Sequence, residues 1–274
     1  MTDTRTILIT GATDGLGRAL ASGLAAEDAQ LILHGRSREK LDRAAAEIAR
    51  EHGGRAPATA LADLADLKQV RDLSHQVAQI TDRLDVLVNN AGIGSGEPDG
   101  RTRRLSADGY ELRFAVNYLA GFDLTLRLLP LLAASPAARI VNVASIGQHP
   151  LDFSDVMLEH NYSGARAYGQ SKLAQITAGF VLAERLTAPA ITVNSLHPAT
   201  YMPTKMVLEE IGHSIDTLEE GELATRRLVS EPSLANTTGR FFDRTRETRA
   251  NADAYDPDTR SRLWQLSLEL TDAP

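Results

Sequence analysis

Two side chains four residues apart, Tyr168 and Lys172, form a pair that could transfer protons. In a helix this spacing places the phenol and the ammonium on one face, about one turn apart. A phenol normally keeps its proton up to a pH of about 10, but a fixed positive charge beside it favours the phenolate. Such a tyrosine can act as a general acid or base near neutral pH. Because Tyr-x-x-x-Lys is a common pattern, the elements around it must decide its meaning.

Short apolar runs rich in β-branched residues alternate along the chain with amphipathic stretches. This alternation is typical of βαβ units, in which helices cover both faces of a parallel sheet. We therefore predict an α/β fold, a single Rossmann domain over 1–274 with a doubly wound, seven-stranded parallel sheet. Right-handed crossovers would place the ligand crevice at the carboxyl ends of the strands. Asp256-Pro257 is a suitable start for a last helix running to about residue 270. The expected strands cover 6–10, 30–33, 55–61, 84–89, 139–143, 191–196 and 239–242.

The segment 10–17 follows the first expected strand directly and leads into a helix. Its three glycines, spaced Gly-x-x-x-Gly-x-Gly, would let a pyrophosphate approach the backbone at a helix N-terminus. A plain turn between strand and helix is the alternative, but the position of the loop at the start of a βαβ chain argues against it. We assign cofactor contacts in this loop to Gly11, Thr13, Asp14, Gly15, Leu16 and Gly17.

The end of the second expected strand decides between NAD and NADP in such folds. No carboxylate occurs there between His34 and Glu39. Arg36 could direct two N–H groups onto a 2′-phosphate, and Ser37 could add a hydroxyl donor. The alternative is that Arg36 only faces solvent at a helix start, where a positive side chain gains nothing from the helix dipole. We predict that NADP(H) is preferred and that NAD(H) is possible.

Further fragments follow in order along the chain. The sequence Asn-Asn-Ala-Gly at 89–92 closes the fourth expected strand, Asn117 lies in a helical segment, and Ser145 follows the fifth strand, before Tyr168 and Lys172. Together with the glycine loop, these fragments resemble the short-chain dehydrogenase/reductase family over most of the chain. The resemblance implies a catalytic tetrad of Asn117, Ser145, Tyr168 and Lys172. It also implies cofactor contacts at Asp63, Leu64, Asn90, Ala91, Gly92, Tyr168, Lys172, Pro198 and Thr200.

The resemblance implies a role for each member of the tetrad. Ser145 would donate a hydrogen bond to the substrate carbonyl oxygen, and Tyr168 would donate or remove the proton. Lys172 would hold the nicotinamide ribose and favour the phenolate, while Asn117 would anchor a water that links Lys172 to solvent. The cofactor itself carries the hydride. A turn cap at Ser145 and a buried structural amide at Asn117 are the alternatives.

Some features depart from the most common family pattern. Asp14 stands where many NADP-using members have a basic residue, and the interval from Ser145 to Tyr168 is longer than in typical members. The segment 151–162, together with 171–174 and 196–198, is similar to the retinol-dehydrogenase-like and protochlorophyllide-reductase-like branch. We expect no counterpart of the membrane anchor of the vertebrate retinol enzymes, so retinoid specificity does not carry over.

The substrate pocket is expected to come from 147–160, from 200–220 and from the C-terminal segment. His149 and His197 are outside the tetrad positions, and we interpret them as structural or pocket-lining. After Pro198 the family's glycine is replaced by alanine, so the threonine that contacts the cofactor is expected between Thr200 and Thr204. The first residues of the expected lid are Tyr201, Met202 and Met206.

The composition limits the functional classes. The 274 residues include no cysteine, which excludes disulfides and thiolate metal sites, and no spacing of His, Asp or Glu suggests a metal. A net charge of -7 disfavours nucleic-acid binding. No signal peptide and no apolar run near the roughly 20 residues of a membrane span are evident, so we expect a cytoplasmic protein without a membrane partner. The resemblance implies a homodimer or homotetramer formed through 109–133 and 166–187.

The sequence therefore predicts an NADP-dependent carbonyl reductase or alcohol dehydrogenase that acts on a small to medium, partly apolar substrate. One alternative is an epimerase or dehydratase on the same fold, but such enzymes usually have Gly-x-x-Gly-x-x-Gly and a larger C-terminal domain. The other is a non-catalytic dinucleotide-binding sensor, but such proteins tend to have lost the tyrosine or the lysine.

Overall fold

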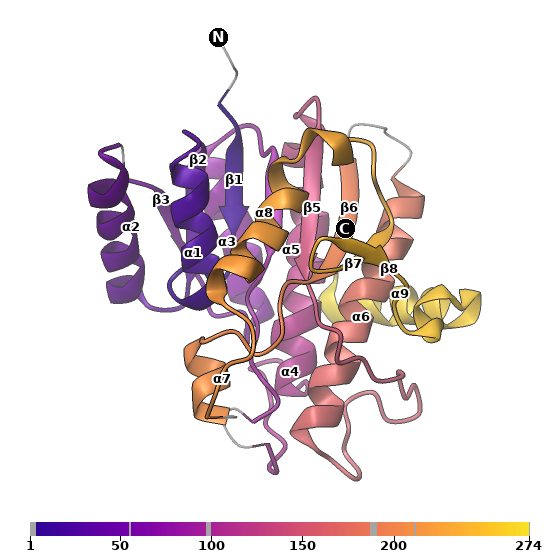
Figure 1. The fold of residues 1–274 in the computed structure, drawn as a ribbon. Helices are drawn as coiled ribbons and strands as arrows, with labels where there is room; N and C mark the ends of the chain where they lie inside the picture. The colour runs from indigo at the N-terminus through magenta and orange to yellow at the C-terminus, as the bar shows by residue number, and fades with distance from the viewer. Residues whose placement is uncertain (1–3, 55, 97–99, 187–190, 211, 274) are drawn as a thin grey trace.

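Strands and helices alternate along the chain as the sequence predicts (Figure 1). The computed structural model describes residues 4–54, 56–96, 100–186, 191–210 and 212–273, except for the side chains of residues 205, 206 and 210. The strands are β1 (Thr6–Ile9), β2 (Gln30–Gly35), β3 (Ala58–Leu61), β4 (Val86–Asn89), β5 (Ala138–Val143), β6 (Ile191–His197), β7 (Arg240–Asp243) and β8 (Arg246–Thr248). The helices of two turns or more are α1 (Gly15–Ala25), α2 (Arg38–His52), α3 (Leu67–Ile80), α5 (Ala120–Ala133), α6 (Gly164–Arg185), α8 (Leu218–Ser230) and α9 (Pro257–Thr271). Residue 55, at the start of one expected strand, lies outside the described residues.

The strands form one sheet in the order β3-β2-β1-β4-β5-β6-β7-β8. The first seven are parallel, as predicted, but β8 pairs antiparallel with β7. The prediction of a seven-stranded, wholly parallel sheet is therefore one strand short. All residues of β8 are exposed, so it lacks the alternation of apolar and polar residues by which a half-buried strand is recognised. The turn from β7 passes through Arg244, whose φ of 53° lies in the left-handed region.

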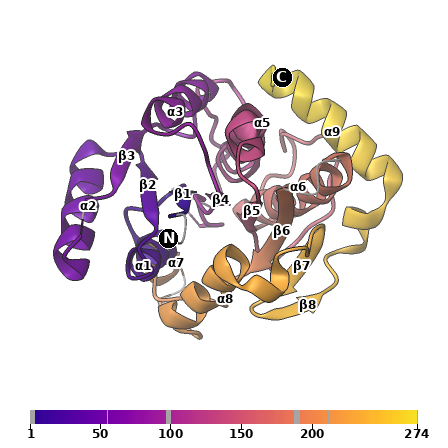
Figure 2. The same ribbon diagram turned by 90° about the horizontal axis from the view of Figure 1, so that it is seen from above.

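Helices cover both faces of the sheet, which Figure 2 shows from above. Successive side chains of β1 point to opposite faces, as in any strand. Ile7 and Ile9 pack in one apolar cluster with residues of α1, α2 and α8. Leu8 packs in a second cluster with residues of α3, α5 and α6. The carboxyl ends of the strands, which point down in Figure 1, are left to the loops that form the site.

The crossover from β6 to β7 has the opposite hand to the others. The connections from β4 to β5 and from β5 to β6 advance across the sheet through α5 and α6 on one face. The step from β6 to β7 advances in the same direction but runs through α8 on the other face. The prediction of right-handed crossovers is therefore wrong at this step. Its long connection, 198–239, passes over the carboxyl end of the sheet before α8 begins, so the short-connection geometry that enforces the right hand does not apply.

The expected helix at 109–133 begins at Leu112 and is not uniform. A short helix α4 (Leu112–Phe114) leads into a π-helical turn, η1 (Ala115–Leu119), and then into α5. Contrary to the expectation that no apolar run is long enough, the 22 residues Leu112–Ala133 could cross a membrane by length and composition alone. However, 67% of the apolar 18-residue window within it is buried inside the protein. It is accordingly packed as a core helix.

The C-terminal helix α9 starts at the predicted Asp256-Pro257 pair, where the Asp256 carboxylate accepts a hydrogen bond from Thr259 N–H. It lies against α5 and α6 (Figure 2). The ring of Trp264 packs edge-on against Phe122 at a centroid separation of 5.1 Å. Association through α5 and α6 stays a prediction, but α9 covers part of the surface on which it depends.

Candidate active site

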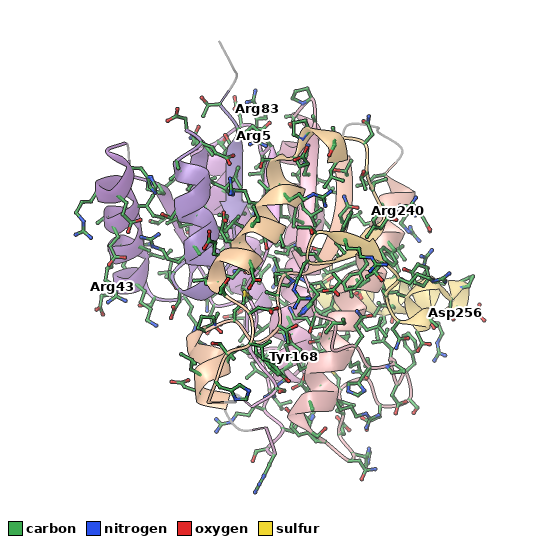
Figure 3. All side chains as sticks on the ribbon, in the orientation of Figure 1. Arg5, Arg43, Arg83, Tyr168, Arg240 and Asp256 are labelled. Atoms are coloured by element: carbon green, nitrogen blue, oxygen red, sulfur yellow. The ribbon has the colours of Figure 1, made fainter. Side chains whose placement is uncertain are left out.

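A cavity of about 740 Å³ lies at the carboxyl ends of the strands, a size typical of small-molecule sites. Figure 3 shows Tyr168 at this end of the sheet, between the lid helix α7 (Lys205–Glu210) and α6. Two of the predicted site residues, Ser37 and Asn117, do not line the cavity. The others do: Gly11, Thr13, Asp14, Gly15, Leu16, Gly17, Arg36, Asp63, Leu64, Asn90, Ala91, Gly92, Ser145, Tyr168, Lys172, Pro198 and Thr200.

The glycine loop leads into the N-terminus of α1, where backbone N–H groups are free to bind an anion. Gly11 has a φ of +65°, and a Cβ there would lie 2.9 Å from Ala91 Cα. A Cβ at Gly17 would lie 2.3 Å from the carbonyl oxygen of Gly11. No side chain fits either position, so the loop keeps a bare backbone cradle for a phosphate. The Asp14 carboxylate caps the helix by accepting from Gly15 N–H at 2.7 Å, which gives this acidic residue a structural role.

Asn90 and Thr10 hold the glycine loop to the loop after β4. Asn90 Nδ2 donates to the carbonyl oxygens of Thr10 at 2.8 Å and Gly11 at 3.2 Å. Thr10 Oγ1 accepts from the N–H groups of Asn90 at 2.9 Å and Ala91 at 3.0 Å. Asn90 therefore shapes the cavity by fixing two backbone segments, which is the partly structural role that its position suggests.

Two basic residues line the cavity after β2. Arg36 is exposed there, and Lys40 stands beside it on the first turn of α2. Ser37 instead caps α2, with its hydroxyl accepting from Lys40 N–H at 3.4 Å. Within the described residues Arg36 makes no ion pair, whereas Arg38 contacts Thr59 at 3.1 Å. Lys40 was not predicted, although a basic residue in a first helical turn, where the dipole is unfavourable, was an available signal.

Asp63 and Leu64 lie where the adenine is expected. Asp63 Oδ1 accepts from Ala65 N–H at 3.0 Å, and Asp63 N–H donates to Gln69 Oε1 at 2.9 Å. These contacts fix the backbone after β3, so the position of the Asp63 carboxylate at the cavity wall is set before any ligand binds.

Helix α6 carries Tyr168 and Lys172 on the same face, as the spacing predicts. Lys172 Nζ lies 5.9 Å from the centroid of the Tyr168 ring. Lys172 is 4% exposed, and its ammonium donates to the carbonyl oxygen of Val143 at 2.8 Å and to Gln175 Oε1 at 3.4 Å. Burial lowers the pKa of Lys172 to about 8, because a low-dielectric surrounding disfavours the charged form. The lysine can therefore lose its proton at a pH near 8.

Asn117 lies in the π-helical turn η1 and is buried. Its Oδ1 accepts from Ile93 N–H at 2.8 Å, and its Nδ2 donates to Ile93 O at 3.1 Å and to Ser171 Oγ at 3.1 Å. The side-chain amide thus ties the loop after β4 to α6, beside Lys172. π-helical turns of this kind occur frequently at functional sites.

Ser145 stands at the end of β5 and is 9% exposed. Its Oγ accepts from Gly147 N–H at 3.0 Å, which leaves the hydroxyl hydrogen available to a ligand. Across the cavity, a Cβ at Gly92 would lie 3.5 Å from Lys172 Nζ. Ser145, Tyr168 and Lys172 all line the cavity, and the ammonium of Lys172 contacts Val143, two residues before Ser145.

The segment after β6 forms a lid whose base is held by charged residues. Thr200 N–H donates to Asp216 Oδ2 at 2.6 Å, and Arg244 forms an ion pair with Asp216. Thr200 Oγ1 lies 3.1 Å from Nε2 of His197. Burial lowers the pKa of His197. Asp216 and Arg244 were not predicted, because a contact between two loops so far apart in the chain leaves no local pattern.

The lid also reaches the glycine loop. A Cβ at Gly15 would lie 3.0 Å from Thr204 Cγ2. The expectation for the Met206 side chain lies outside what the structure describes. Of the predicted segment 200–220, the residues that line the cavity are Thr200, Tyr201, Met202, Thr204 and Val207.

The predicted segment 147–160 contributes less to the pocket than expected. Gly147 and His149 line the cavity, but residues 150–160 do not, and neither does the C-terminal segment up to residue 273. The Asp152 carboxylate pairs with Arg166 at 2.8 Å, and Phe153 lies under Arg262 of α9. This part of the chain supports α6 from outside the cavity. The apolar residues of the lining include Ile93, Leu112, Val116, Ile146, Ala165, Met202 and Val207.

No group of three His, Asp or Glu side chains among the described residues is arranged to hold a metal ion. The donors that converge on the cavity are backbone N–H groups, hydroxyls and cations. These groups suit phosphates and a carbonyl oxygen.

The model of the short chain dehydrogenase family matches residues 5–212, most of the chain and all of the cavity-lining residues. The chain is a short-chain dehydrogenase. Human "Retinol dehydrogenase 14" is 33% identical over 290 residues, covering 96% of this chain and 85% of its own. A provisionally named daunorubicin C-13 ketoreductase from Streptomyces sp. (strain C5) is 33% identical over 277 residues, covering 96% of this chain and 91% of its own. These relatives confirm the predicted branch.

Two solved structures with a bound nicotinamide dinucleotide have the same fold. One from Escherichia coli CFT073, complexed with NADPH, has a TM-score of 0.72 and 29% identity, covering 87% of this chain and 95% of its own. The RhlG/NADP complex from Pseudomonas aeruginosa has a TM-score of 0.71 and 26% identity, covering 88% of this chain and 95% of its own. This short-chain dehydrogenase is therefore an oxidoreductase that binds a nicotinamide dinucleotide and acts on a small molecule. The bare glycine cradle and the basic end of its cavity fit that cofactor.

Proposed function

We propose that this short-chain dehydrogenase is an NADP-dependent enzyme that interconverts a ketone or aldehyde and an alcohol. The observation that supports this most strongly is the continuity of the cavity. It runs from Arg36 and Lys40 past the glycine loop to Ser145, Tyr168 and Lys172, and ends at an apolar wall.

The chain's residues would orient the dinucleotide along this cavity. Arg36 and Lys40 supply two cations for a 2′-phosphate, and a guanidinium can bind it through two N–H groups. The N-terminus of α1 would hold the pyrophosphate. Asp63 and Leu64, which line the cavity, would border the adenine. When bound, the cofactor supplies or accepts the hydride.

The remaining chemistry belongs to the tetrad. The hydroxyl of Ser145 donates a hydrogen bond to the substrate oxygen and thereby fixes the position of the carbonyl carbon. Tyr168 gives its proton to that oxygen in reduction and removes it in oxidation. The ammonium of Lys172 favours the phenolate that remains. Asn117 keeps the loop after β4 in contact with α6, so that the cavity wall beside Lys172 does not move.

The substrate is proposed to be a partly apolar carbonyl compound or alcohol of small to medium size. The cavity that Ser145 and Tyr168 line also contains the apolar residues Ile93, Leu112 and Val116. His149 adds one polar group to this end, where a Cβ at Gly169 would lie 2.2 Å from His149 Cδ2. The names of two relatives refer to retinol and to a ketone at C-13 of daunorubicin.

The test is a panel of ketones and aldehydes of increasing apolar size, scored by consumption of NADPH with NADH in parallel. We expect turnover that improves with apolar size up to the capacity of the cavity and that is faster with NADPH. Loss of this turnover in Tyr168→Phe excludes a contaminating reductase. A wild-type enzyme that binds NADPH but reduces no member of the panel, and oxidises none of the matching alcohols, would contradict the proposal.

A further inference from the structure

A buried histidine joins the two loops that border the adenosine end of the cavity. His34, near the end of β2, is 2% exposed and lines the cavity. Gly11 N–H donates to His34 Nδ1 at 3.2 Å, and His34 Nε2 lies 3.1 Å from the carbonyl oxygen of Ala62. One imidazole therefore connects the glycine loop after β1 with the residue that precedes Asp63.

Backbone contacts run beside this imidazole. Ala12 N–H donates to the carbonyl oxygen of His34 at 2.9 Å, and Ala62 N–H donates to that of Gly35 at 3.2 Å. Next to them, a Cβ at Gly35 would lie 2.6 Å from Thr13 Cγ2. The packing here is tight, so the glycine loop and the loop at Ala62 and Asp63 have little room to move independently.

The two partners of His34 determine its tautomer. The Gly11 N–H is a donor, so Nδ1 must present its lone pair, and the Ala62 carbonyl is an acceptor, so Nε2 must carry the hydrogen. Burial lowers the pKa of His34 to about 4, against the opposing effects of the Ala62 carbonyl and the Asp63 charge. The carboxylate of Asp63 is the charged group that acts on the ring from the β3 side; the glycine loop presents a backbone N–H. The imidazole is therefore neutral at physiological pH.

We propose that His34 is a positioning residue for the adenosine half of the dinucleotide site, because it holds the glycine loop and the loop at Ala62 and Asp63 at a fixed separation. The inference rests on the proposed function only in that a dinucleotide occupies the cavity. The side chain of His34 contacts the loops after β1 and β3. It does not contact the loop after β5 or helix α6, which carry Ser145 and Tyr168. His34 therefore supports NADPH and NADH equally, unlike the cations at the 2′-phosphate.

The effect should be on binding and not on the chemical step. His34→Ala leaves the Gly11 N–H and the Ala62 carbonyl without their partner in a buried place. The loss of buried hydrogen bonds of this kind corresponds to an increase of about 10-fold in a dissociation constant. We expect this increase in Kd for NADPH, NADH and AMP, measured by fluorescence or calorimetry on the whole chain. Nicotinamide mononucleotide should bind as before, and kcat at saturating cofactor should stay within about twofold, since no group at the reacting atoms changes.

Three further variants separate positioning from general stability. His75→Ala, at an exposed site on α3, is the matched control and should leave every Kd unchanged. His34→Asn can still offer an acceptor to Gly11 N–H, and His34→Gln can offer an N–H to the Ala62 carbonyl. Each should recover part of the lost affinity. A purely structural role would lower the melting temperature of His34→Ala without changing the ratio of fragment affinities.

The wild-type protein provides a second measurement if His34→Ala does not fold. Its Kd for NADPH should rise as the pH falls towards 4, where Nδ1 takes up a proton and can no longer accept from Gly11. In His34→Asn, which has no imidazole to titrate, this rise should be smaller, because only protonation of the 2′-phosphate, at a pH of about 6, remains. The inference is overturned if folded His34→Ala binds both dinucleotides as the wild type does, if it loses NADPH alone, or if the two pH profiles coincide. Failure of the wild type to bind any dinucleotide would instead contradict the proposed function.

Discussion

The cofactor end and the substrate end of the cavity are built in different ways. At the cofactor end, His34 and Asn90 hydrogen-bond to the backbone of the loops after β1 and β3, and the glycines there admit no side chain. At the substrate end, large apolar side chains remain exposed around the lid, including Tyr201 at 45% and Ile215 at 61%. The first region is closed by contacts among short, buried segments, while the second presents apolar surface without a complete partner.

The difference shows which properties of the enzyme the fold constrains. Backbone hydrogen bonds and glycine contacts allow one shape, so the cofactor end can hold only a ligand with correctly placed phosphates. The lid is tied down by an ion pair between Asp216 and Arg244, which are 14% and 40% exposed. Such partly exposed pairs contribute little stability. Changes at the cofactor and catalytic residues should therefore have large effects, and changes at the lid small ones.

The largest effect is expected from Tyr168→Phe. Without the phenol the proposed proton donor to the substrate oxygen is missing, and kcat should fall by about 10³-fold, within the range of general acid catalysis. The Kd for NADPH should stay nearly unchanged. Steady-state kinetics and a binding titration on the same preparation measure both quantities. Activity above a few per cent of wild type would show that another group donates the proton.

Arg36→Asp should weaken NADPH binding by about 50-fold, because a charge-assisted contact to the 2′-phosphate is replaced by repulsion. NADH, which lacks that phosphate, should be affected far less. Arg38→Asp is the matched control, because Arg38 is turned towards Thr59 and Asp42. If the ratio of the two dissociation constants does not move in Arg36→Asp, the 2′-phosphate binds elsewhere.

The buried lysine should produce a pH dependence at the catalytic end. If the ammonium of Lys172 is required, kcat/KM should fall as the pH rises through about 8. In Lys172→Arg, which stays charged, this alkaline limb should vanish even if the rate is low. If kcat/KM still falls at alkaline pH in Lys172→Arg, the group that titrates is Tyr168 or the substrate.

The same lysine should make folding stability depend on pH. The pKa of Lys172 in the folded protein lies below that of a free lysine, so the unfolded chain binds more protons between the two values. The free energy of unfolding should therefore rise with pH across this window.

The smallest effect is expected at the lid. Arg244→Ala removes the ion pair with Asp216 and a 3.3 Å contact with Thr200 Oγ1. The substrate KM should rise by about threefold with kcat little changed, in line with the energy of a partly exposed pair. Asp216→Asn should give a similar result, and the double variant should be no worse than either. A loss comparable to that of Arg36→Asp would show that the lid is as firmly held as the cofactor end.

Much of the site was predictable because its chemistry is local in sequence. The glycine loop, the helix start at Asp14 and Gly15, and the pair at Tyr168 and Lys172 each lie within a few residues, where one turn of backbone sets the geometry. The start of the last helix, at Asp256 and Pro257, was also predictable because an N-cap and a first-turn proline are adjacent in sequence. The strand β8 and the reversed crossover before β7 were not predictable, since one lacks an apolar pattern and the other depends on the path of a long connection.

The remaining site residues could not be predicted from a local sequence pattern. His34 reads in sequence as one more residue of a strand, and only the folded loops give its two nitrogens partners. The partnership of Asp216 and Arg244 depends on the β7–β8 turn, which the sequence does not indicate. The segment 150–160 looked like a pocket wall because it lies between Ser145 and Tyr168 in the chain, yet it packs outside α6.

The sequence by itself determined the family, the dinucleotide fold and the residues that could transfer a proton, because glycine spacing, helix spacing and strand alternation are properties of short segments. The tertiary structure decided which side chains hold the loops apart, which segments face the substrate and where α9 lies. These depend on contacts between residues distant in the chain, and burial, which lowers the pKa values of Lys172 and His34, exists only after the chain has packed.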